Sequence, residues 1–129
     1  MDLNWENKTI LVVDDTKLNF ILLKTLLRKT NAKIIWLENG QEIIDYVQSE
    51  KVADIILMDI RMPIIDGVEA SKIIKKMAPH IPIIIQTASV MGEAFDDIKF
   101  SGCDDTIFKP INGAKLLEIV QKQFEKYSK

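Results

Sequence analysis

The sequence predicts an α/β fold in which five parallel β-strands form one sheet between two layers of helices. Short apolar runs rich in Val and Ile recur along the chain, and they barely alternate between apolar and polar residues, which is typical of strands buried on both faces. Stretches with helical spacing of apolar residues separate these runs. Because a parallel strand follows its neighbour only through a crossover, this order predicts a doubly wound, three-layer (βα)5 sandwich.

The predicted strands are residues 9–13 (TILVV), 33–37 (KIIWL), 52–58 (VADIILM), 81–86 (IPIIIQ) and 106–108 (TIF). The predicted helices are residues 17–29, 41–49, 67–77, 93–100 and 112–127. In the first helix Lys17, Lys24 and Arg28 share one arc, so we expect the opposite face to be core, with Leu22, Leu23, Leu26 and Leu27. The fourth helix is short and lies between Gly92 and Gly102. The last helix repeats apolar residues at core spacing: Leu116, Leu117, Val120 and Phe124.

Length and composition indicate one domain over residues 8–129, preceded by a lead-in over residues 1–7. The chain has 129 residues, 47% hydrophobic and 28% charged, which is ordinary for a compact protein with its own core. The formal net charge of −2 gives no reason to expect binding to nucleic acid or to an anionic membrane. The single cysteine, Cys103, and the lack of a leader or a membrane-spanning run predict a cytoplasmic protein.

Polar side chains follow four of the predicted strands at the point where each strand ends. Asp14 and Asp15 follow the first strand, Asp59 the third, Thr87 the fourth, and Lys109 with Pro110 the fifth. Ligands bind beyond the carboxyl ends of the strands in this architecture, so we expect these side chains to meet at one edge of the sheet.

Three neighbouring carboxylates need a balancing charge, because two of them about 4 Å apart repel by roughly 4 kcal/mol at an effective dielectric constant near 20. Hard oxygen ligands without His or Cys favour Mg²⁺ or a similar cation, and Lys109 supplies a further positive charge. One carboxylate is then free to attack a phosphoryl group, and Asp59 is the best candidate because it stands alone at its strand end. Taken singly, each residue has a plainer interpretation: Asp14 and Asp15 could cap the next helix, and the others could be turn or surface residues.

The set of motifs resembles the receiver domains of two-component response regulators over residues 9–124. The motifs are ILVVDD at 10–15, ILMDI at 56–60, MP at 62–63, DG at 66–67, TA at 87–88 and KP at 109–110. The resemblance implies a flavodoxin-like fold with strand order 2-1-3-4-5. It also implies a domain that is no conventional enzyme but takes part in its own phosphorylation and dephosphorylation.

The same resemblance implies a role for each matching residue. Asp59 would accept the phosphoryl group from a phosphohistidine. Mg²⁺ (or Mn²⁺) would be bound by Asp15, Asp59 and the backbone carbonyl of Arg61, with Asp14 acting through water. Thr87 and Lys109 would bind phosphoryl oxygens.

Switching and tuning are expected at the neighbouring positions. The small Ala88 leaves room for the incoming group, and the Lys109–Pro110 bond is usually cis in the family. Thr106 stands where many receivers carry Tyr or Phe, which argues against an aromatic switch coupled to Thr87. Arg61 and the second variable position, Ser89, are expected to tune dephosphorylation.

Partner recognition is expected on the first helix. Leu18, Phe20 and Ile21 lie outside its buried stripe, and they could dock a histidine kinase or a histidine phosphotransfer domain, although ordinary exposed apolar residues would look the same. The segment from Asn4 to Leu23 is similar to receivers of hybrid sensor histidine kinases, whereas the alternative is a free-standing regulator.

Three other classes fit less well. A haloacid-dehalogenase-type phosphatase needs its two aspartates two residues apart after the first strand, and a flavodoxin needs a phosphate loop where Asp14 and Asp15 stand. A binding module that has lost phosphorylation remains the third alternative.

Overall fold

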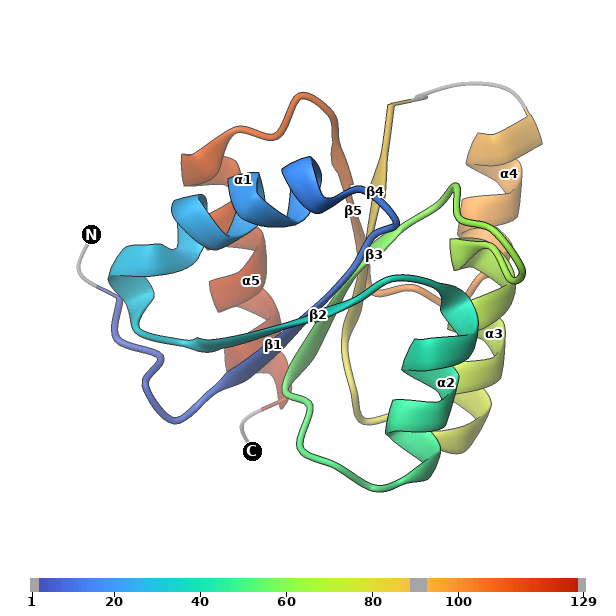
Figure 1. Cartoon of the computed structure of the whole chain (residues 1–129), viewed down its shortest axis with the longest axis horizontal. Helices are drawn as coiled ribbons and strands as arrows, with labels where there is room; N and C mark the ends of the chain where they lie inside the picture. The colour runs from blue at the N-terminus through green and yellow to red at the C-terminus, as the bar shows by residue number, and fades with distance from the viewer. Residues whose placement is uncertain (1–2, 89–92, 128–129) are drawn as a thin grey trace.

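The computed structural model describes residues 3–88 and 93–127. Its sheet contains β1 (Thr9–Val13), β2 (Lys33–Leu37), β3 (Ile55–Asp59), β4 (Ile83–Thr87) and β5 (Asp105–Phe108). The strand order is β2-β1-β3-β4-β5 and every pair is parallel, so the predicted topology is confirmed. The direction of the strands changes across the sheet, so that the sheet is twisted (Figure 1).

Helices cover both faces of the sheet (Figure 1). On one face lie α1 (Lys17–Leu27), which continues as a short 3₁₀ turn over Arg28–Thr30, and α5 (Gly113–Tyr127). On the other face lie α2 (Gly40–Gln48), α3 (Gly67–Met77) and α4 (Glu93–Phe100). The buried apolar side chains form two clusters, one on each face, so the alternate residues of every central strand supply both cores.

The sequence overstates the burial of both edge strands and of one residue of α1. The strand β2 has the predicted bounds but lies at the edge, where its residues are half-buried or exposed instead of buried on both faces. In β5 Thr106 is half-buried and Phe108 is 41% exposed, because this strand lies at the other edge of the sheet. Leu22 was expected in the core but is 46% exposed, because the buried stripe of α1 runs through Leu23 and Leu27.

The lead-in packs against the domain through Trp5, which is only 5% exposed. Its ring meets Phe124 of α5 edge-on at a centroid distance of 5.1 Å, and its indole Nε1 donates to Gln121 Oε1 over 2.9 Å. The backbone N–H of Trp5 donates to the carbonyl of Thr30, 2.6 Å away. Trp5 thus closes the end of the core between α1 and α5.

The loop after β3 folds back tightly onto the strand end. Asp66 caps α3 by accepting from the Glu69 N–H over 2.9 Å, and the Gly67 N–H donates to the carbonyl of Ile60 over 2.9 Å. A Cβ atom at Gly67 would lie 2.2 Å from the carbonyl oxygen of Asp59, so only glycine allows α3 to begin here. This turn fixes the position of the third strand end relative to α3.

Candidate functional site

Three carboxylates meet at the carboxyl edge of the sheet, as the sequence predicts. One oxygen from each of Asp14, Asp15 and Asp59 lies within 4.8 Å of the others. Asp14 and Asp59 are buried, at 0% and 6% exposure, whereas Asp15 is exposed. The cluster therefore has two members under the surface and one facing solvent.

The polar contacts of Asp14 leave one of its atoms without a partner. Its Oδ1 accepts from the Thr16 N–H over 2.8 Å, while its Oδ2 is buried and has no hydrogen-bond partner. Burial raises the pKa of the Asp14 carboxyl, and the charge of Asp59 adds to this, against the lowering by the Thr16 N–H, by Lys109 and by the side chain of Asn19. An unpartnered acidic oxygen in such a site is what a cation, bound directly or through water, would satisfy.

Lys109 supplies the positive charge at the site. Its Nζ lies 3.0 Å from Asp59 Oδ1, and both side chains are largely covered. The backbone N–H of Lys109 donates to the carbonyl of Thr87 over 2.8 Å, which ties the ends of β4 and β5 together. Thr87 is 2% exposed, and the Lys109–Pro110 peptide bond is cis, as predicted.

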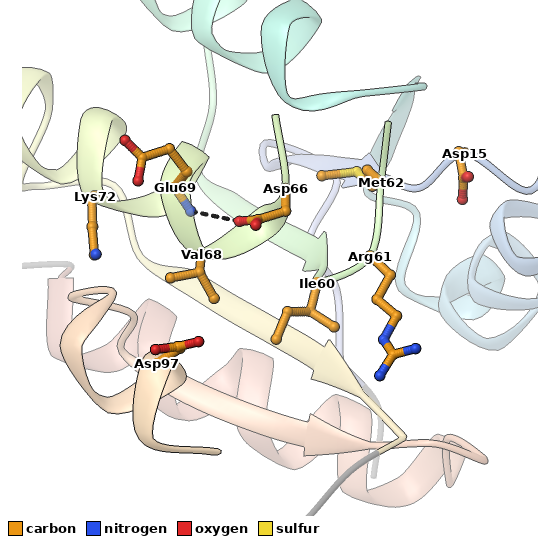
Figure 2. A pocket seen from close by; sticks show the side chains of 9 residues that line it. All are labelled: Asp15, Ile60, Arg61, Met62, Asp66, Val68, Glu69, Lys72 and Asp97. Carbon is orange, nitrogen blue, oxygen red and sulfur yellow. Dashed lines mark hydrogen bonds between the residues drawn. The ribbon is translucent and has the colours of Figure 1, made fainter. Parts of the chain in front are cut away.

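A cleft of about 660 Å³ opens beside the carboxylates, between the β3–α3 loop, α3 and α4. Figure 2 shows Asp15 and the extended side chain of Arg61 at one end of this cleft and Lys72 at the other. The side chain of Arg61 is exposed. The cleft is lined by Asp15, Ile60, Arg61, Met62, Asp66, Val68, Glu69, Lys72 and Asp97.

Of the predicted tuning residues, Ala88 lies at the carboxyl edge of the sheet, whereas Thr106 lies further back, opposite Ile85 of β4. Ala88 follows β4 and is exposed, and Thr106 is half-buried in β5 beside Cys103, with 4.0 Å between Oγ1 and Sγ. Ser89 lies outside the described residues.

The predicted docking residues of α1 fall into two groups. Leu18 and Ile21 are 72% and 45% exposed, and Leu22 joins them on the surface. Phe20 is half-buried instead, with its ring stacked on Trp36 at a centroid distance of 5.1 Å and an interplanar angle of 7°. Sequence reasoning did not single out Trp36, which belongs to no motif, and it assigned Leu22 to the core because helical spacing alone misplaced the buried stripe.

Comparison with known proteins decides the family. A family model described as the response regulator receiver domain matches residues 10–121. The chain belongs to this family. The receiver is thus part of two-component signalling, and the phosphatase and flavodoxin alternatives lose their support.

The relatives of this receiver include long kinases and short regulators. It is 38% identical to "Hybrid signal transduction histidine kinase I" of Dictyostelium discoideum over 126 residues, which is 92% of this chain but 7% of that protein. It is 33% identical to the polar-differentiation response regulator DivK of Brucella anthropi, over 88% of this chain and 94% of that protein. The chain spans only a small part of the hybrid and sensor kinases that it matches, 7% and 13% of two of them.

A solved structure supports the same assignment. The receiver domain of sensor histidine kinase PA1611 from Pseudomonas aeruginosa superposes with a TM-score of 0.85 at 27% identity, covering 92% of this chain and 98% of that one. That crystal structure has a magnesium ion coordinated in its active site cleft. In the part of this receiver that the structure describes, no helix combines the length and apolar character needed to cross a membrane.

Proposed function

We propose that this receiver takes a phosphoryl group from a phosphohistidine onto Asp59. The observation that carries the proposal is the buried Asp59 carboxylate, which lies against Lys109 at 3.0 Å and within 4.8 Å of two more carboxylates. Lys109 Nζ donates to Oδ1 of Asp59, and in the proposed reaction Oδ2 would attack. The histidine would belong to a histidine kinase or a histidine phosphotransfer domain.

In the proposed reaction an Asp59 oxygen attacks phosphorus while the bond between phosphorus and the imidazole nitrogen breaks. The imidazole leaves with the bonding electrons and takes up a proton, and an aspartyl phosphate is formed. Lys109 and the Thr87 hydroxyl would bind phosphoryl oxygens, since transfer depends mainly on positioning and charge stabilisation. Ala88 would leave space for the group beside Thr87.

We propose Mg²⁺ (or Mn²⁺) as the cofactor. The donor set fits such an ion, because it offers hard oxygens and because Asp14 Oδ2 is buried without a partner. Asp15, Asp59 and the backbone carbonyl of Arg61 would hold the ion directly, with Asp14 acting through water. When bound, the ion would neutralise charge on the phosphoryl oxygens.

Phosphorylation is proposed to switch partner binding through Thr87, the adjacent Ala88 and Ser89, and the loop that contains Pro110. Thr106 offers no aromatic ring for the switch. Leu18 and Ile21 remain candidates for docking the phosphodonor, whereas Phe20 offers a smaller exposed surface because it is stacked on Trp36. We further propose a cytoplasmic domain that belongs to a hybrid histidine kinase, with a free-standing regulator as the alternative.

A mass spectrum after incubation with acetyl phosphate and Mg²⁺ tests the proposed chemistry. We expect one added phosphoryl group on the wild type and none on Asp59→Asn, while Asp45→Asn, which changes an exposed aspartate of α2, should behave as the wild type. Phosphorylation of Asp59→Asn at the wild-type rate would refute the assignment. A wild type that takes up no phosphoryl group would favour the binding module that has lost phosphorylation.

A comparison of two phosphodonors tests the docking residues. Ile21→Asp combined with Lys24→Glu should slow transfer from a histidine phosphotransfer domain at least tenfold and leave the reaction with acetyl phosphate at saturating Mg²⁺ unchanged. Equal loss with both donors would contradict docking on α1, because it would point to damage at the carboxylate cluster itself.

A further inference from the structure

The indole of Trp36 makes a direct contact with the backbone of the site. Its Nε1 donates to the carbonyl oxygen of Asp14 over 2.7 Å, although Trp36 belongs to the edge strand β2 and lies 22 positions away in the chain. The regular ladder between β1 and β2 ends with the pair Val13 and Leu37. The N–H of Glu38, the residue after β2, donates to the side-chain Oε1 of Glu42 in α2 over 3.0 Å instead. The indole therefore provides a donor at a point where the strand pairing has ended.

This hydrogen bond completes the fixation of Asp14. The N–H of Asp14 donates to the Leu37 carbonyl over 3.0 Å, and its Oδ1 accepts from the Thr16 N–H over 2.8 Å. With the carbonyl held by Trp36, each polar atom of Asp14 except Oδ2 has a partner. The placement of the unpartnered Oδ2 thus depends on contacts that lie outside the cluster.

The ring of Trp36 is itself held in place from α1. Phe20 stacks on it in nearly parallel planes, at 5.1 Å and 7°, and Lys24 Nζ lies 5.8 Å from the Phe20 ring centroid. A stack of this kind restricts the rotation of the indole, so that its N–H keeps its aim. The helix α1 and the edge strand β2 together hold the donor that reaches Asp14.

We infer that Trp36 is a positioning residue for the cation site: it orients Asp14 so that Oδ2 faces the bound ion. The inference rests on the proposed function, in which Asp14 helps to bind Mg²⁺. A merely structural Trp36 would stabilise the fold without affecting the affinity for the ion. The two roles can be separated by a control at Trp5, the one other tryptophan of the chain, which is buried and contacts Phe124 and Gln121 of α5 instead of the carboxylate cluster.

The test compares Mg²⁺ binding by Trp36→Phe and Trp5→Phe, measured by isothermal titration calorimetry. Each variant loses one indole N–H bond, to Asp14 in one case and to Gln121 in the other. Trp36→Phe should bind Mg²⁺ about three- to tenfold more weakly, as expected for the loss of one hydrogen bond. It should also need correspondingly more Mg²⁺ for half-maximal phosphorylation by acetyl phosphate, with the rate at saturation unchanged. Trp5→Phe should bind the ion within twofold of the wild type.

Two further measurements keep the test decisive. In Trp5→Phe the emission comes from Trp36 alone, and it should change with the same midpoint as the calorimetric titration. If Trp36→Phe does not fold, Phe20→Leu keeps the indole N–H but removes its support, and Mg²⁺ binding should weaken two- to threefold.

Wild-type affinity in Trp36→Phe, or an equal loss in Trp5→Phe, would overturn the role of Trp36 while leaving the proposed function intact. Unaltered binding by Phe20→Leu or a silent Trp36 emission would do the same. A wild type that binds no Mg²⁺ would overturn the proposed function and this inference together.

Discussion

The substitution Asp14→Asn should stabilise this receiver in the absence of divalent ions. The carboxylate of Asp14 is buried, its Oδ2 has no partner, and the carboxylate of Asp59 lies within 4.8 Å. An amide at this position carries no charge, and its N–H₂ group can donate to a neighbouring carboxylate. The substitution therefore removes a repulsion and supplies a hydrogen bond where the wild type has none.

The size of the effect follows from the distances. Two unit charges 4.8 Å apart repel by about 3.5 kcal/mol at an effective dielectric constant near 20, and a buried unpartnered acceptor costs about 1–3 kcal/mol. Lys109, 3.0 Å from Asp59, cancels much of the repulsion, and Asp15 is exposed and screened. We therefore expect a gain of about 1–3 kcal/mol in the free energy of unfolding.

Urea unfolding with EDTA and with saturating Mg²⁺ measures this prediction. With EDTA, Asp14→Asn should be the more stable protein. At 100 times the dissociation constant the ion should stabilise the wild type by about 2.7 kcal/mol, and it should stabilise the variant much less. The control Asp45→Asn changes an exposed aspartate, so it should follow the wild type in both conditions. Lower stability of Asp14→Asn with EDTA would refute the reasoning.

The difference in stability between Asp14→Asn and the wild type should depend on pH, and the direction follows from the pKa of Asp14. Because burial raises the folded-state pKa of Asp14 above its ordinary 3.8, ionisation costs more in the folded state than in the unfolded state. The wild type is therefore penalised above the folded-state pKa, and this penalty fades as the pH falls toward 3.8. The advantage of Asp14→Asn should shrink over the same range.

Three further predictions concern other parts of the molecule. Tyr127→Phe removes a hydrogen bond of 2.6 Å to Asp104 and should lower the free energy of unfolding by about 1–2 kcal/mol near pH 8. This bond raises the pKa of Tyr127 to about 12, so the difference in stability between variant and wild type, measured by urea unfolding, should vanish as the pH rises from 10 to 12. Ile64→Gly should add about 0.5–1 kcal/mol to the free energy of unfolding, because Ile64 has a φ of 72° and is 79% exposed, whereas Ile64→Ala, which keeps the strain, should add nothing. Arg61→Ala should shorten the lifetime of the aspartyl phosphate at least threefold by opening the path of water, and an unchanged rate in a phosphate-release assay would contradict the role of Arg61.

The fold could be predicted from the sequence because its central strands are buried on both faces and therefore have a strong apolar pattern. The bounds of β1, α3 and α4 agree with the prediction, and those of β3 and β4 shift toward the site. The predicted strand 52–58 begins too early because Val52 and Ala53 are apolar, yet Val52 is 65% exposed before the strand begins. The hydrophobicity of a segment does not reveal at which residue its hydrogen bonding to the neighbouring strand begins.

The candidate site was predictable for a related reason. Asp59 is the last residue of its strand, Asp14, Asp15 and Lys109 follow theirs, and the topology of a parallel sheet brings such residues to one edge. The network around Asp104 could not be predicted in the same way. Asp104 Oδ2 lies 2.6 Å from Lys75 Nζ of α3, and Asp104 Oδ1 accepts from the Tyr127 hydroxyl of α5 over 2.6 Å. These partners share no motif and lie far apart in the sequence.

The contacts of Asp104 and Asp14 show how the same residue type serves opposite purposes in one fold. Burial raises the pKa of Asp104, but hydrogen bonds from Lys75, Tyr127 and the Ile83 N–H outweigh it and the pKa is lowered overall. Asp14 has fewer such partners, and its pKa is raised. A carboxylate whose oxygens are all satisfied, as in Asp104, favours the folded protein at neutral pH without any ligand. A carboxylate left with an open oxygen, as in Asp14, is less stable alone and gains more from a cation, so the binding energy of the ion is in part the relief of that instability.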